Sequence, residues 1–214
     1  MSEPLTVGAP AAAGPVRPVR ALARAASTLI VIAALLEVLI AVGNWLTYEL
    51  ISSYLTDETT LAELERHDTV VSLLNWLDIA AMLAAAVTFL CWLWRARVNA
   101  EIRAPQRLHR GWVIGGWLCP LVNLAFPYVI VRDVSRPSVG RAVVAWWWVL
   151  LLAGTLLDRF VRYFELRAPK SLDQVRDGAV HSTVAAALRL GAAVLVVVII
   201  RRVSRSCLDA HVNV

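Results

Sequence analysis

Three ionisable side chains interrupt long apolar runs of this sequence, and such groups can carry chemistry inside a membrane. Glu37, Asp78 and Arg189 each fall near the middle of their run. A charge there costs about 2.5–3.5 kcal/mol on insertion scales and usually faces a partner or water. Small residues surround Asp78 and Arg189, which lets helices approach closely. We therefore predict an ion pair between Asp78 and Arg189, with a transport role as the alternative. Asn75 completes the predicted intramembrane polar cluster.

A second candidate site is the apolar segment 111–137, which no straight helix accommodates. Pro120 and Pro127 each remove a backbone donor and clash with the carbonyl four residues before them. Broken helices often line sites in membrane proteins, so the segment is either a gate or binding loop, or a kink packed against neighbouring helices. The candidate residues of this segment are Trp112, Trp117, Pro120, Asn123, Pro127 and Tyr128.

The sequence carries no pattern that is typical of an enzyme active site or a metal site. It contains no Gly-rich phosphate loop, nucleophile elbow, zinc motif or paired catalytic carboxylates. The cysteines Cys91, Cys119 and Cys207 lack Cys-x-x-Cys or Cys/His ligand spacing, so we expect structural thiols. We therefore expect no enzyme, no catalytic residue, no metal and no cofactor.

The composition indicates a membrane protein. Hydrophobic residues make up 59% of the 214 residues and charged residues 17%, whereas a soluble domain carries about 25% charged residues. The apolar residues collect in blocks, which predicts an all-α polytopic membrane protein. A net charge of +5 would suggest nucleic acid in a soluble protein. Here the arginines flank apolar runs, so we expect the lipid bilayer as partner and no nucleic acid.

Four apolar runs predict four transmembrane helices, and polar loops are expected between them over residues 48–69, 95–110 and 158–178. The run 142–157 gives about 24 Å of helix, which is short for a hydrocarbon core of about 30 Å. Arg159 and Arg162 can lengthen it by snorkelling. Thr60 and Ser171 are expected to begin helices as N-caps. The four runs are 25–46, 70–94, 142–157 and 179–200.

The chain divides into three predicted regions around these runs. Residues 1–23 are rich in Ala, Pro and Gly and are expected to form a disordered cytoplasmic tail. Residues 24–206 form the helical membrane domain, and residues 207–214 form a C-terminal tail. The arginine-rich loop 95–110 is expected in the cytoplasm, and the acidic loop 48–69 on the other side.

The central segment 111–131 decides the number of crossings. Full crossing gives five spans, whereas entry and return gives four spans with both chain ends in the cytoplasm. The distribution of basic residues barely separates the two arrangements. Pro120 and Pro127 favour a re-entrant or interfacial segment. We therefore predict four transmembrane helices plus a proline-broken, re-entrant centre, in a multi-pass protein of the cell membrane.

Two stretches of the sequence resemble a known family. Residues 89–101 read Phe-Leu-Cys-Trp-Leu-Trp-Arg-Ala-Arg-Val-Asn-Ala-Glu, and the segment from Gly111 to Val134 carries the Trp, Pro, Asn and Tyr residues named above. Both are similar to the bacterial family called domain of unknown function 4328, which is found mostly in actinobacteria. The resemblance covers roughly residues 25–203. It implies an integral protein of the bacterial inner membrane with a variable cytoplasmic tail, and no catalytic residue.

These observations together lead to two functional expectations. The first is a non-enzymatic scaffold or interaction protein tied to the cell envelope, with a protein partner or further copies of itself as a homo-oligomer. The alternative is a small transporter or channel that uses Glu37, Asp78 and Arg189.

Overall fold

Four long helices and three short central ones make up the part of the fold that the structure describes. The computed structural model describes residues 18–119, 121–165 and 171–212. No strand occurs within these ranges, so the predicted all-α class is confirmed. The elements in order are α1 (Arg20–Leu55), α2 (Leu61–Arg103), α3 (Trp112–Leu118), η1 (Val122–Leu124), α4 (Phe126–Val134), α5 (Arg141–Glu165) and α6 (Leu172–Val212).

The four long helices are long and apolar enough to cross a membrane, which confirms the four predicted transmembrane helices. An apolar helix satisfies all of its backbone hydrogen bonds internally and can therefore lie in hydrocarbon. The short helices of the central segment do not reach this length. The four spans are Arg20–Leu55, Leu61–Ile102, Arg141–Arg159 and Leu172–Ser206.

The long helices extend well beyond the apolar runs that predicted them. Only residues 56–60 separate α1 from α2, in place of the predicted loop 48–69. Most of the predicted loop 158–178 is also helical, because α5 continues to Glu165 and α6 begins at Leu172. Polarity marks where a helix leaves the lipid, but it does not end the helix, since Glu, Gln and Arg are good helix formers.

Helix-start signals confirm the two predicted N-caps. The backbone N–H of Thr60 donates to Oε2 of Glu63 at 3.1 Å at the start of α2. The backbone N–H of Ser171 donates to Oε1 of Gln174 at 3.0 Å, and Oγ of Ser171 accepts from the backbone N–H of Gln174. Both are capping boxes, in which the third residue of the helix reaches back to the cap.

Helices extend into both of the predicted tails. α1 begins at Arg20, and Val19 just before it is buried in the core. Nη1 of Arg95 donates to the carbonyl oxygen of Pro18 at 3.0 Å, so the chain packs against α2 from that point. Residues 1–17, which fall in the predicted disordered tail, lie outside the described residues. α6 continues to Val212, through most of the predicted tail 207–214.

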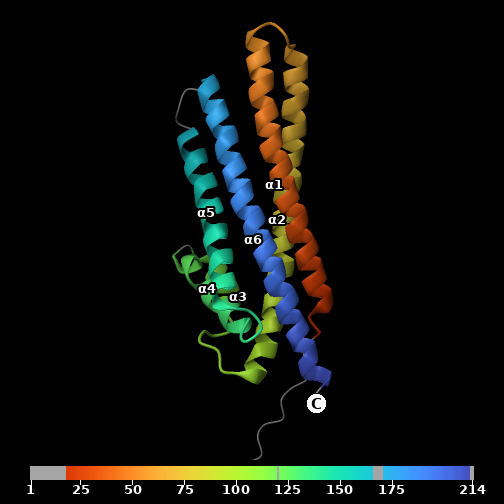
Figure 1. Ribbon diagram of the computed structural model, residues 1–214, viewed down its shortest axis with the longest axis vertical. Coiled ribbons are helices and arrows are strands. Elements are labelled where there is room, and N and C mark those ends of the chain that lie inside the picture. The colour runs from red at the N-terminus through yellow and green to blue at the C-terminus, as the bar shows by residue number, and fades with distance from the viewer. Residues whose placement is uncertain (1–17, 120, 166–170, 213–214) are drawn as a thin grey trace, which may run out of the picture.

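α6 is the central helix of the membrane domain. It packs along α1 on one side and along α5 on the other, whereas α2 packs mainly against α1 (Figure 1). The α1–α2 hairpin and the α5–α6 hairpin therefore stand side by side. We call the end that holds the start of α1 and the end of α6 the inner end, and the opposite end the outer end (Figure 1).

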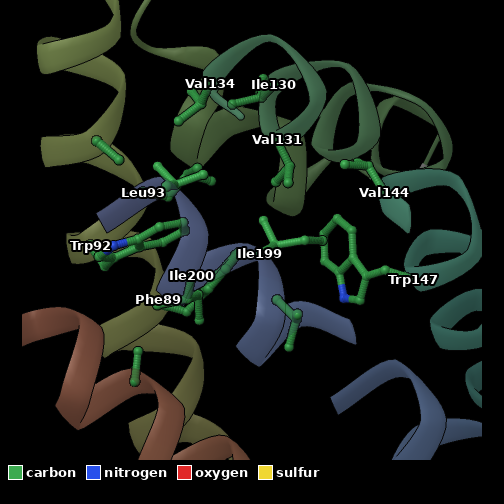
Figure 2. Packing of buried hydrophobic residues seen from close by; sticks show 14 of the residues in the cluster. Phe89, Trp92, Leu93, Ile130, Val131, Val134, Val144, Trp147, Ile199 and Ile200 are labelled. Carbon is green, nitrogen blue, oxygen red and sulfur yellow. The ribbon is translucent and has the colours of Figure 1, made fainter. Parts of the chain in front are cut away.

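An apolar core lies in the inner half of the domain. Side chains from α2, α4, α5 and α6 meet there, and α4 fills the space beside α5 and α6 (Figure 2). The central segment thus contributes to the same core as the long helices. The labelled members of this core are Phe89, Trp92, Leu93, Ile130, Val131, Val134, Val144, Trp147, Ile199 and Ile200.

Candidate functional site

The guanidinium of Arg189 joins three helices in the apolar part of the domain. Its Nη1 donates to Oε1 of Glu37 on α1 at 2.8 Å. Its Nη2 lies 3.2 Å from Oδ2 of Asp158 on α5 and donates to the carbonyl oxygen of Gly154 at 3.4 Å. One arginine of the central helix therefore holds the helices on both of its sides.

The predicted pairing of Arg189 with Asp78 is wrong. Among the described residues, the carboxylates in ion-pair contact with Arg189 are Glu37 and Asp158. The reason lies in the helix arrangement: α6 runs between α1 and α5 and makes few contacts with α2, which carries Asp78. Asp78 still belongs to the neighbourhood, because its charge acts on Glu37. Each long helix thus contributes one acidic or basic side chain to this cluster.

Asn75, the remaining residue of the predicted polar cluster, forms a hydrogen bond within its own helix, α2. Its Nδ2 donates to the carbonyl oxygen of Val71 at 2.8 Å, four residues earlier. Such a bond satisfies the amide locally and does not join α2 to another helix. The side chain is half-buried and lies one turn from Asp78.

Gly154 lets α5 approach the arginine closely. A Cβ atom at this position would lie 2.8 Å from Cγ of Arg189 and 3.3 Å from the backbone oxygen of Ala185. Any larger residue would therefore push α5 away from α6. Five small residues are predicted on the Arg189 face of α6: Ser182, Ala185, Ala186, Ala192 and Ala193. The four alanines are buried, as expected of a close helix contact, and Ser182 is partly buried.

Asp158 is the charged residue of this cluster that the sequence pattern did not reveal. It follows the apolar run 142–157 directly and therefore falls in a predicted loop. The structure shows that α5 continues past it. The useful signal was Gly154, which lies four residues earlier and therefore on the same helix face as Asp158. A glycine and a carboxylate one turn apart leave room for a long basic side chain from a neighbour.

The central segment enters from the inner end and returns to it. α2 ends and α5 begins at this end (Figure 1), and α3 and α4 fold back on each other between them. Gly116 allows the close crossing, because a Cβ atom there would lie 3.1 Å from Cβ of Phe126. Pro127 lies in the first turn of α4, where its missing N–H costs nothing. It begins a helix rather than kinking one, and Pro120 lies outside the described residues.

A hydrogen bond fixes how deep the segment reaches. Nε1 of Trp148 on α5 donates to the carbonyl oxygen of Leu124 at 2.9 Å. Trp148 lies two helical turns above Arg141, the first residue of α5, which is about 10 Å. The tip of the segment therefore lies well inside the span without crossing it. Its side chains Leu118 and Leu121 are exposed, by 77% and 83%, as suits contact with lipid.

Two candidate residues of the central segment, Trp112 and Trp117, pack against neighbouring aromatic rings. The Trp117 ring meets Phe89 and Trp148 edge-on at centroid distances of 5.9 and 5.8 Å. Trp112 packs in the same way on Phe126 at 4.8 Å. Such T-shaped contacts are favourable for aromatic pairs. These contacts agree with the interpretation of the segment as a packed kink.

Asn123 and Tyr128, two further candidate residues of the central segment, make contacts with polar or charged groups. The backbone N–H of Asn123 donates to the carbonyl oxygen of Cys119 at 2.8 Å and closes the turn at the tip. The guanidinium of Arg132 lies over the Tyr128 ring at 5.4 Å, a cation–π contact. Within the described residues, Nε1 of Trp117 and Oδ1 of Asn123 are buried without a hydrogen-bond partner.

A network of arginines and carboxylates holds the inner end of α2 against the central segment. Buried Arg97 donates to the carbonyl oxygen of Leu108 and lies 3.4 Å from Glu101. Glu101 also accepts from Arg110 at 2.5 Å, and this hydrogen bond raises the pKa of Arg110. The sequence predicts only a cytoplasmic loop for most of these residues. The sequence feature that drew attention to Arg97 and Glu101 was the family-like motif at residues 89–101.

The described residues contain no group of three or more His, Cys, Asp or Glu side chains that could hold a metal ion. Cys91 and Cys119 are free and exposed. The geometry offers ion pairs between the long apolar helices and an arginine-rich inner end.

Comparison with protein families shows which family the chain resembles. The model described as Domain of unknown function (DUF4328) matches residues 56–205, which is more than two thirds of the chain. The match begins just before α2 and includes the central segment and most of α6. No curated protein and no solved structure matches this chain.

Proposed function

We propose that this chain, which belongs to the DUF4328 family, is a non-enzymatic scaffold or interaction protein of the cell membrane. The observation that carries the proposal is the contact of Arg189 with both Glu37 and Asp158. An arginine that bridges two carboxylates on two other helices fixes the packing of those helices. The charges inside the spans then hold the helices together. Because they are paired, they avoid the free-energy cost of an isolated charge in hydrocarbon.

α2 is the helix that such a role leaves available to a partner. Only 6% of its most apolar stretch is buried inside the domain, against 44% for α6. Trp76 and Leu83 on this helix are exposed by 68% and 64%. A transmembrane helix of a protein partner, or α2 of a second copy, can pack on this face through van der Waals contacts.

The proposed orientation places the inner end in the cytoplasm, with both ends of the described chain there. Arginines mark the inner end, from Arg20 and Arg24 on α1 to Arg201 and Arg202 on α6. Acidic residues gather around the turn 56–60 at the outer end. Cytoplasmic segments near membrane spans carry an excess of Lys and Arg, which supports this orientation.

In-cell photo-crosslinking tests the interaction role. A photo-crosslinking amino acid at Trp76 or Leu83 should yield a discrete adduct with a second copy or a partner protein. The matched control is Ile199, which is fully buried in the domain and should yield none. Adducts with lipid alone at both α2 positions would contradict the proposal.

A transporter or channel is the second candidate function, because of one carboxylate oxygen of Glu37. Oε2 of Glu37 is buried and has no hydrogen-bond partner among the described residues. A carboxylate oxygen in that state can take up a proton or a cation. Purified protein in liposomes should show no proton or sodium flux above protein-free liposomes if the scaffold proposal holds. Flux that Glu37→Gln abolishes would instead establish the transporter.

A further inference from the structure

Four arginines at the inner end lie close to one hydrogen bond between two segments. Oγ of Ser138, in the link between α4 and α5, donates to Oγ of Ser206 on α6 at 2.7 Å. We call the exposed arginines around this bond the inner arginine patch. Two come from the link and the start of α5, and two from the end of α6: Arg136, Arg141, Arg202 and Arg205.

The patch carries positive charge that the described residues do not balance. Arg97, Arg107, Arg110 and Arg132 nearby each face a carboxylate. No carboxylate among the described side chains forms an ion pair with any arginine of the patch. Like charges held close together repel, so a multivalent anion that bridges them would be favourable.

The patch lies at the level where phospholipid headgroups begin. Arg141 immediately precedes the apolar run of α5, and Arg202 closely follows the apolar run of α6, which ends at Ile200. Guanidinium groups bind phosphate oxygens through two parallel hydrogen bonds, which makes arginine well suited to a headgroup.

Exposed apolar side chains of the central segment lie deeper in the domain than Arg141. Arg141 and Trp148 are seven residues apart and therefore lie on the same face of α5. Trp148 holds the tip of the central segment through Leu124, and the exposed side chains of Leu118 and Leu121 belong to that tip. A phospholipid with its phosphate at Arg141 can thus lay its acyl chains against this tip, about 10 Å deeper.

We propose that the inner arginine patch and the tip of the central segment together bind an anionic phospholipid of the inner leaflet. The arginines hold the phosphate, and Leu118 and Leu121 contact the acyl chains. The occupant is a lipid because charged and apolar surfaces are stacked in the order that a phospholipid presents them. This site is independent of the intramembrane ion pairs and of the proposed scaffold role.

Native mass spectrometry of the detergent-purified full chain, titrated with phosphatidylglycerol, tests the proposal. Wild type should bind phosphatidylglycerol more tightly than phosphatidylcholine. The double variant Arg141→Gln with Arg202→Gln should weaken phosphatidylglycerol binding about 25-fold, from about fivefold per arginine near a membrane surface. The matched control, Arg66→Gln with Arg176→Gln, removes two exposed outer-end arginines and should leave binding unchanged.

Three further arms separate lipid binding from damaged folding and from the binding of other anions. Arg141→Lys with Arg202→Lys keeps the charge but not the two parallel hydrogen bonds, so it should weaken phosphatidylglycerol binding less than the Gln variant does. A loss equal to that of the Gln variant would overturn the proposal. Inorganic phosphate should not displace the lipid, because it lacks the acyl chains. Displacement by inorganic phosphate or by a short DNA duplex would overturn the lipid assignment, as would equal losses in the outer-end control.

Discussion

Arg189 and Glu37 are 152 residues apart in the chain, yet Nη1 of Arg189 donates to Oε1 of Glu37 at 2.8 Å. The contact joins α6 to α1, the two helices nearest the middle of the domain (Figure 1). Asp158 adds α5 through the other terminal nitrogen of the same guanidinium. In this arrangement the charged residues of the apolar spans have a structural role, because their ion pairs hold three helices together.

Gly154→Ala should lower the free energy of unfolding by about 1–3 kcal/mol, the range for overpacking a close contact. The added methyl would lie 2.8 Å from Cγ of Arg189 and close to the backbone of Ala185, which cannot retreat easily. Chemical unfolding in detergent, followed by Trp fluorescence, measures the change.

The matched control for Gly154 is Gly115→Ala. A Cβ atom at Gly115 would meet only ordinary contacts, 3.5 Å from the nearest atom of Trp112. This substitution should be neutral or stabilising, because Ala forms helices better than Gly by about 1 kcal/mol. Equal destabilisation by both variants would contradict the close approach of α5 to Arg189.

Trp148→Phe should loosen the tip of the central segment without disturbing the helices. It keeps an aromatic ring in the core and removes the N–H that Leu124 accepts. A fully buried carbonyl left without its donor costs about 1–3 kcal/mol, and the partly buried carbonyl of Leu124 should cost less. Hydrogen–deuterium exchange of residues 121–125 should rise. Trp146→Phe is the control, since Trp146 is 61% exposed, and the same rise in that variant would count against this role of Trp148.

Cysteine accessibility tests the path of the chain through the membrane. In a cysteine-free background, Ala104→Cys and Arg136→Cys should resist an impermeant thiol reagent added to intact cells. Glu58→Cys and Asp173→Cys should react. All four positions are exposed in the fold. The first two should react after permeabilisation. Labelling of Arg136→Cys from outside would mean that the central segment crosses the membrane.

The positions of the spans followed from the sequence because hydrophobicity is a local property. Pro120 and Pro127 also predicted the break in the centre, and the return of the segment to the inner end agrees with that prediction. The ends of the helices were predicted less well. Polar residues such as Glu49 and Asp158 mark the edge of the lipid, whereas helical hydrogen bonds continue beyond it.

The partner of Arg189 could not be predicted from depth alone. The sequence predicts that Glu37, Asp78 and Arg189 all lie near mid-membrane, so predicted depth allows either carboxylate to pair with the arginine. The choice depends on which helices are neighbours, and α6 packs on α1 and α5. Neighbour relations arise from packing between segments distant in sequence, and no local pattern records them. The family match likewise covers α2 to α6 without indicating which helices touch.

A double-mutant cycle between Glu37 and Arg189 tests the central claim most directly. Glu37→Gln, Arg189→Gln and the double variant are unfolded in detergent, with a parallel cycle between Asp78→Asn and Arg189→Gln. Arg189→Gln alone should cost about 3–5 kcal/mol, as breaking a buried pair does. The Glu37–Arg189 coupling should fall in the range of about 0.5–3 kcal/mol found for residues in contact and exceed the Asp78–Arg189 coupling. Additive losses for Glu37 and Arg189, with strong coupling for Asp78 and Arg189, would contradict the account.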